Sequence, residues 1–177
     1  VPAGKAEYYK RRLSEKYYSL IVEREAEKTR VKKEKLPTMY EDKYIIEAID
    51  NQTLAKAIAK MEKKLGAKIE PPYVVRIKPG TRLIKKDAFM DNNDIEVVIF
   101  PDDVMMIEDG RNYYDYKLHD QVTIGAFIDC RNLKRLVFSG NLREIGMYAF
   151  AGCSSLENID IPDSVREIGE GAFMDCS

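Results

Sequence analysis

The sequence predicts an α+β fold, in which an N-terminal α-helical region precedes a parallel-stranded solenoid with repeats of about 23 residues. Apolar residues recur at helical spacing in the first part of the chain, and Ala-Phe pairs recur in the rest. Of the 177 residues, 45% are hydrophobic and 33% are charged, which argues against a disordered tail and against a membrane-spanning protein. We therefore predict a helical region over residues 1–72 and a repeat region over residues 73–177.

The chain opens with a predicted basic amphipathic helix over residues 5–22. Tyr9, Leu13 and Tyr17 recur at helical spacing and give it a tyrosine-rich face. Residues 1–36 hold 11 Lys and Arg against 6 Asp and Glu, whereas the remainder is acidic. This helix either covers the first repeat as a cap or binds a partner, and both interpretations stay open.

Residues 39–65 are predicted to form two helices or one kinked helix. The apolar run at 44–49 is followed by Asp50 and Asn51, which are both common N-cap residues. Apolar residues then recur at helical spacing as far as Leu65, and Gly66 suits the position that ends a helix. Two prolines at 71 and 72 separate the helical region from the repeats.

The Ala-Phe pairs set the period of the repeat region. They begin at Ala88, Ala126, Ala149 and Ala172, so the last two intervals are 23 residues and the first is 38. Within each repeat an apolar-x-apolar pattern predicts one short strand, and stacking would align these strands into a parallel sheet with inward apolar ladders. Because the chain stops at Ser177 in mid-repeat, we expect the repeats to continue in a longer protein.

Residues 156–176 read Leu-x-x-Ile-x-Ile-Pro-x-x-Val-x-x-Ile-Gly-x-x-Ala-Phe-x-x-Cys. This pattern closely resembles the BspA-type leucine-rich repeat, and the resemblance covers about residues 75–177. It implies a binding scaffold, since known members include bacterial and protist surface proteins with adhesive roles. A cell-surface or secreted location follows from the resemblance alone. The unpaired cysteines are more typical of a cytoplasmic protein, so the location stays open.

The predicted function is a non-catalytic protein–protein interaction scaffold. If the strands are placed correctly, the candidate binding surface consists of the side chains that face away from the core: Val97, Ile99, Arg135, Val137, Asn158 and Asp160. An insertion near 108–123 adds clustered tyrosines, which are good interface anchors: Tyr113, Tyr114 and Tyr116. These tyrosines either contact a partner or pack back on the repeats.

An alternative function is association with nucleic acid through the basic N-terminal segment. The side chains that would contact phosphates are Lys10, Arg11, Arg12, Lys28, Arg30, Lys32, Lys33 and Lys35. The acidic repeat region argues the other way, because it would repel the same polyanion.

No enzyme activity, cofactor, metal or small-molecule substrate is predicted. Cys130, Cys153 and Cys176 occupy one repeat position, which indicates a buried ladder of small side chains. They lack the paired spacing of a zinc site. His119 is the sole histidine, and no nucleophile signature surrounds any cysteine.

Overall fold

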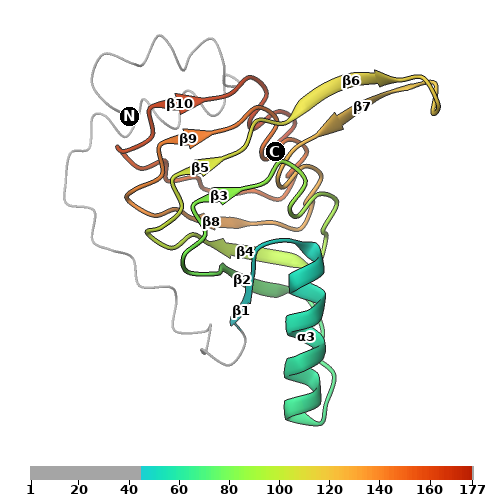
Figure 1. Ribbon diagram of the computed structural model, residues 1–177, viewed down its shortest axis with the longest axis vertical. Coiled ribbons are helices and arrows are strands. Elements are labelled where there is room, and N and C mark those ends of the chain that lie inside the picture. Colours follow the sequence, from blue (N-terminus) through green and yellow to red (C-terminus); the bar gives the residue numbers. More distant parts are fainter. Residues whose placement is uncertain (1–44, 177) are drawn as a thin grey trace.

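The computed structural model describes residues 45–176. The helix predicted over residues 5–22 and the basic side chains of the nucleic-acid hypothesis lie outside this range. Within it, the chain forms two parallel sheets, one helix and one antiparallel hairpin (Figure 1).

The two parallel sheets have four strands each. The first sheet has the order β1 (Ile45–Ala48), β2 (Tyr73–Ile77), β4 (Ile95–Ile99), β8 (Arg135–Val137). The second has the order β10 (Glu167–Ile168), β9 (Glu144–Ile145), β5 (Met106–Ile107), β3 (Leu83–Ile84). From β2 to β9 the chain visits the two sheets in turn, so each winding adds one strand to both. In the second sheet, Ile145 pairs with Ile168, 23 residues further along.

A single apolar core lies between the sheets. Val75 pairs in register with Val98, and Val98 with Leu136, which builds the inward ladder expected from the repeat pattern. The phenylalanines form a second column, in which Phe127 stacks between Phe89 and Phe150 at ring-centroid distances of 5.0 and 5.1 Å. Such stacking adds about 0.5–1.5 kcal/mol per pair beyond the burial of the rings.

The expectation of helix over residues 44–49 is wrong for Ile45–Ala48, which form β1. Ile46 and Ala48 are only 1% and 2% exposed, whereas Glu47 between them is exposed. This alternation has the period of a strand, and β1 pairs in parallel with β2. Pairing with an existing sheet outweighs the local helical spacing, because it buries both side chains in the core.

The helix α3 (Asn51–Leu65) forms as the sequence predicts. Asp50 is its N-cap and accepts a hydrogen bond from the backbone of Thr53, and Gly66 ends it in the left-handed conformation. Leu54 is 2% exposed and belongs to the same core as the repeats. The core is therefore continuous across residue 72, and the division into two domains there stays a prediction.

The start of α3 is tied to the first repeat by side-chain amides. Asn51 donates from Nδ2 to the carbonyl oxygen of Met90 at 3.1 Å. Its own Oδ1 accepts a hydrogen bond from Asn92 at 2.6 Å. Asn92 stands at the repeat position that cysteine occupies in the later repeats, so the polar residue appears where the column faces a helix.

Candidate protein-binding surfaces

The outward face of the first sheet carries two columns of side chains. In one column Val97 lies between Val74 and Arg135 in the strand register. In the other, Ile99 pairs with Val137 on β8. The first sheet therefore brings four of the predicted binding residues into these two adjacent columns.

These residues differ in exposure. Ile99 and Val137 are half-buried, and Arg135 is exposed. Val97 is only 1% exposed, so the expectation that its side chain lies on an open surface is wrong. It lies on a central strand and pairs in register with Val74, which is also buried.

The last two predicted residues lie beyond the regular sheet. Arg135 and Asn158 are joined by an isolated parallel bridge, and Asp160 follows outside any strand. Both Asn158 and Asp160 are exposed. Asp160 already has an interaction within the molecule, so its carboxylate is not an unpaired charge.

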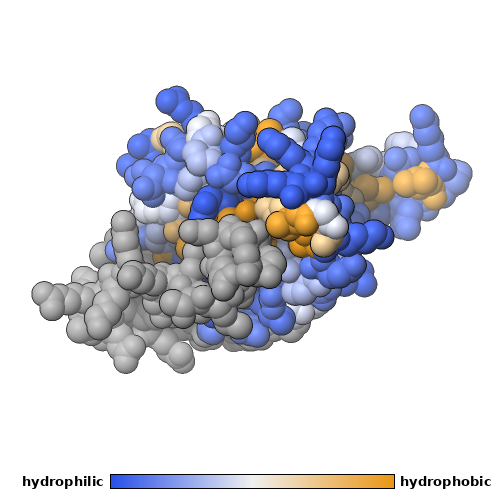
Figure 2. All heavy atoms as spheres, turned by 90° about the horizontal axis from the view of Figure 1, so that it is seen from below, coloured by the Kyte–Doolittle hydropathy of each residue, from blue (hydrophilic) through white to orange (hydrophobic). Residues whose placement is uncertain are grey.

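The predicted insertion is an antiparallel hairpin of β6 (Arg111–Asp115) and β7 (Asp120–Ile124). It projects away from the two sheets (Figure 1), so its outer tyrosines do not pack back on the repeats. Tyr116 is 81% exposed and Tyr114 43%, with their rings 5.1 Å apart edge to face. Figure 2 shows apolar side chains on this projection among hydrophilic ones.

Tyr113 differs from the other two tyrosines. It is half-buried, and the guanidinium of Arg111 lies 4.9 Å from its ring centroid. This cation–π contact supports the hairpin base, which leaves Tyr114 and Tyr116 as the accessible anchors.

Two glycines frame the hairpin where it leaves the stack. A Cβ at Gly110 would collide with the carbonyl oxygen of Ile124, and one at Gly125 with that of Tyr148. The backbone of Gly110 also donates to Met147 at 2.8 Å. Close backbone approach therefore fixes both ends of the hairpin against the next repeat.

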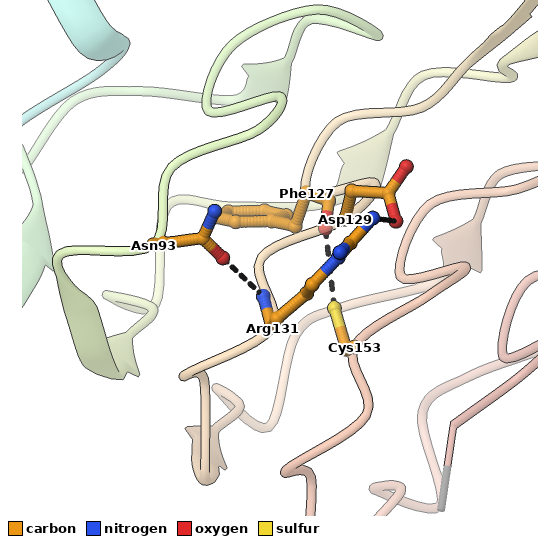
Figure 3. Close-up of polar contacts among 5 residues, drawn as sticks. All are labelled: Asn93, Phe127, Asp129, Arg131 and Cys153. Carbon is orange, nitrogen blue, oxygen red and sulfur yellow. Dashed lines mark hydrogen bonds and ion pairs between the residues drawn. The ribbon is translucent and has the colours of Figure 1, made fainter.

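The cysteines form the ladder expected from their repeat position. Cys130 and Cys153 are buried and donate from Sγ to the carbonyl oxygens of Phe89 and Phe127, each at 3.1 Å. Figure 3 shows Cys153 pointing at Phe127. Burial raises the pKa of Cys130 to about 12. A hydrogen bond with Cys176, together with burial, raises the pKa of Cys153. These pKa shifts keep both sulfurs as unreactive thiols at neutral pH.

A polar contact on the surface links two windings beside this ladder. The backbone of Arg131 donates to Oδ1 of Asn93 at 2.8 Å, and its guanidinium lies 3.4 Å from Asp129 (Figure 3). Both groups of the ion pair are exposed, so the pair itself contributes little to stability.

Metal sites and membrane-spanning helices are the other kinds of feature considered for residues 45–176. No cluster of three or more histidine, cysteine or acidic side chains in this range could hold a metal ion. No helix within it has the length and apolar character needed to cross a membrane.

Two residues of these surfaces were not predicted from the sequence, Arg76 and Leu118. Arg76 lies between Glu47 and Ile99 in the outward column of the first sheet. The spacing could have placed it, because Val75 and Ile77 stand as far before Ala88 as the strand residues of later repeats stand before theirs. Leu118 is 68% exposed at the end of the hairpin, and no local pattern indicates that exposure.

Comparison with known proteins gives one family match. Residues 120–177 match the family described as "BspA type Leucine rich repeat region (6 copies)". No curated protein matches the chain. Among solved structures, it is similar to the crystal structure of a leucine rich cell surface protein from Faecalibacterium prausnitzii A2-165. The identity is 32% and the TM-score 0.49, over 60% of this chain and 24% of that chain, so the present chain spans a minor part of that protein's length. Residues 120–177 therefore carry the sequence pattern of a BspA-type leucine-rich repeat region.

Proposed function

We propose that this chain is a non-catalytic protein-interaction scaffold, whose solenoid of about 23-residue repeats binds a partner through the outward face of the first sheet. The observation that carries the proposal is the pair Ile99 and Val137, two half-buried aliphatic side chains adjacent in register on a sheet face. Exposed Arg135 lies beside them. An apolar centre with a polar margin suits a protein surface better than a phosphate backbone.

The hairpin is the second surface of this proposal. Tyr114 and Tyr116 offer large, rigid contact areas at low cost in conformational entropy. The strands β6 and β7 hold them clear of the sheets, so a partner could reach them without displacing the core. We propose that the hairpin and the sheet face both bind a protein partner, and that Tyr113 supports the base of the hairpin.

The repeat family supports a location at the cell surface or outside the cell, as part of a larger adhesive protein. The matched region and the apolar-x-apolar columns are typical of such scaffolds. The nucleic-acid hypothesis rests on side chains outside the described range.

Site-specific photo-crosslinking tests the sheet face. A photoreactive residue at position 99 or 137 should capture the same extracellular protein, and one at Met106 should not. Met106 is the matched control because it is 37% exposed on the second sheet. Purified partner should then bind the Ile99→Ala/Val137→Ala variant about thirty-fold more weakly, because each removed aliphatic contact contributes about 1 kcal/mol.

An unchanged affinity, in a variant whose unfolding midpoint matches the wild type, would contradict the proposal. Capture from position 106 with equal yield would also count against it, because the contact would then not depend on the first sheet.

A further inference from the structure

The helix α3 carries four exposed lysines that none of the surfaces above uses. They recur at intervals of four, three and one residues, so they share one side of the helix. We name these four the α3 lysine row: Lys56, Lys60, Lys63 and Lys64. At 1.5 Å per residue, the row extends about 12 Å along the helix.

The opposite side of α3 is occupied by the core. Leu54 is buried there, and Ala57, Ile58 and Met61 pack against the same cluster. The helix therefore cannot rotate to present its apolar side elsewhere without leaving the sheets. Whatever contacts the lysine row meets ammonium groups and their aliphatic stems, and the one large apolar side chain exposed on this helix is Leu65, at its end.

No neighbouring acid neutralises the row within residues 45–176. Glu62 is the sole acidic residue of α3, and its Oε1 accepts a hydrogen bond from the backbone of Ile69 at 3.1 Å. The ion pairs between described residues involve other cations. Lys56 and Lys60 are four residues apart, as are Lys60 and Lys64, and like charges at this spacing destabilise a helix.

The charge of the row contrasts with that of the sheets. Residues 70–176 contain 12 Lys and Arg against 19 Asp and Glu. The helix projects from the β1 end of the stack (Figure 1), and Figure 2 shows that end with hydrophilic side chains around a smaller apolar patch. Positive charge is thus concentrated on a narrow element at one end of an acidic body.

We propose that the α3 lysine row binds a linear sulfated polysaccharide. A single anionic chain can follow one helix face and needs no contact with the acidic sheets, whereas a duplex or a bilayer presents a broad anionic surface to them. Shallow membrane insertion would need a broad apolar side, and on α3 the core occupies that side apart from the exposed Leu65. Stacking of unpaired bases would need aromatic side chains, and α3 contains none.

Binding of the full chain to size-defined heparin fragments tests this proposal. Wild-type protein should bind heparin with an affinity that falls steeply with salt concentration, because binding releases counterions. The variant Lys56→Gln/Lys60→Gln/Lys63→Gln/Lys64→Gln should bind at least about ten-fold more weakly at the same salt concentration. Its unfolding midpoint should stay close to that of the wild type, since glutamine keeps the helix, and the repulsion that is removed offsets the lost attraction of Lys63 and Lys64 to the helix C-terminus.

The matched control removes equal charge from the basic N-terminal segment, as Lys28→Gln/Arg30→Gln/Lys32→Gln/Lys33→Gln. Retained heparin binding in this control, with loss in the α3 variant, supports the proposal. It is overturned if wild type does not bind, if the α3 variant binds as wild type does, or if the control loses as much affinity. Tighter binding to duplex DNA or anionic vesicles, with the same lysine dependence, would overturn the choice of a polysaccharide.

Discussion

The residue type at the cysteine position of the repeat differs according to what that position contacts. In the later repeats a buried thiol donates to a phenylalanine carbonyl oxygen of the preceding winding, as Cys130 does to Phe89. In the first repeat Asn92 replaces the thiol and contacts Asn51 of α3. A thiol is small and only weakly polar, so it suits a site between windings. An amide suits the site where a helix begins, because it can satisfy a second polar side chain.

The raised pKa of Cys130 makes stability depend on pH at the alkaline end. Desolvation raises its pKa from 9.0 to about 12, so folding favours the protonated thiol. The stabilisation is complete below the unfolded pKa and is lost as pH rises towards the folded pKa. Between about pH 8 and pH 10, the free energy of unfolding should fall by about 1 kcal/mol more in wild type than in Cys130→Ala.

Urea denaturation at each pH measures the free energy of unfolding of both proteins. Subtracting the Cys130→Ala profile from the wild-type profile removes the contribution of lysines, tyrosines and the other cysteines, which titrate in both. Parallel pH profiles for the two proteins would contradict a protonated, desolvated Cys130.

The β6–β7 hairpin is the element that contributes least to the core. Its strands pair over five residues each, from Arg111 with Ile124 to Asp115 with Asp120. Most of its side chains are exposed or half-buried. An isolated two-stranded hairpin is at best marginally stable, so this one depends on its glycine-framed junction with the next repeat.

Shortening the hairpin should therefore leave the fold intact. With residues 112–123 replaced by Asn-Gly, Arg111 and Ile124 stay paired through a two-residue turn. The free energy of unfolding should change by less than about 1 kcal/mol, as measured by urea denaturation. A loss of several kcal/mol would mean that the hairpin supports the sheets, which its exposure does not suggest.

Elements with a strong local signal could be predicted from the sequence, and those defined by pairing could not. Asp50, the helical apolar spacing and Gly66 all act within α3 itself, so its bounds were predictable. The strand at Ile45–Ala48 exists because β2 lies beside it, and four residues carry too little periodicity to reveal that. The insertion was visible as a lengthened interval, but its hairpin register was not.

At the scale of the whole molecule, each winding contacts mainly its neighbours, and the phenylalanine column joins them. Phe127 stacks on Phe89 and on Phe150. It also packs edge to face with Phe100, with the two ring centroids 5.9 Å apart. Phe173, in the last described repeat, stacks on Phe150 alone among the described rings. An arrangement of this kind couples repeats through nearest-neighbour interfaces.

Removal of an interior ring should cost more than removal of a terminal one. Phe127→Ala should lower the free energy of unfolding by about 3–5 kcal/mol, because it leaves a cavity lined by two repeats. The loss in free energy of unfolding for Phe173→Ala should be smaller than that for Phe127→Ala by at least about 1 kcal/mol, since Phe173 has only one stacked neighbour among the described rings. Both values come from urea denaturation, and equal losses would argue against coupling through the column.

The candidate binding surfaces were predictable as positions in a repeat but not as exposed areas. The columns correctly placed Ile99 beside Val137 and Arg135 beside Asn158. They could not show that Val97 is only 1% exposed, because exposure depends on packing that the repeat spacing does not contain. The α3 lysine row was present in the sequence, and only the packing of the opposite face shows which side of that helix stays open.

The amide contacts that fasten α3 bear on glycosylation. Asn51, Gln52 and Thr53 form the acceptor sequence for N-linked glycans. In the folded chain the Asn51 amide nitrogen donates to Met90, its oxygen accepts from Asn92, and the Thr53 hydroxyl contacts Asp50. The atoms that a glycosyltransferase must reach are thus engaged once α3 has docked, so a glycan could be added only before folding and would then keep the helix from closing over the first repeat.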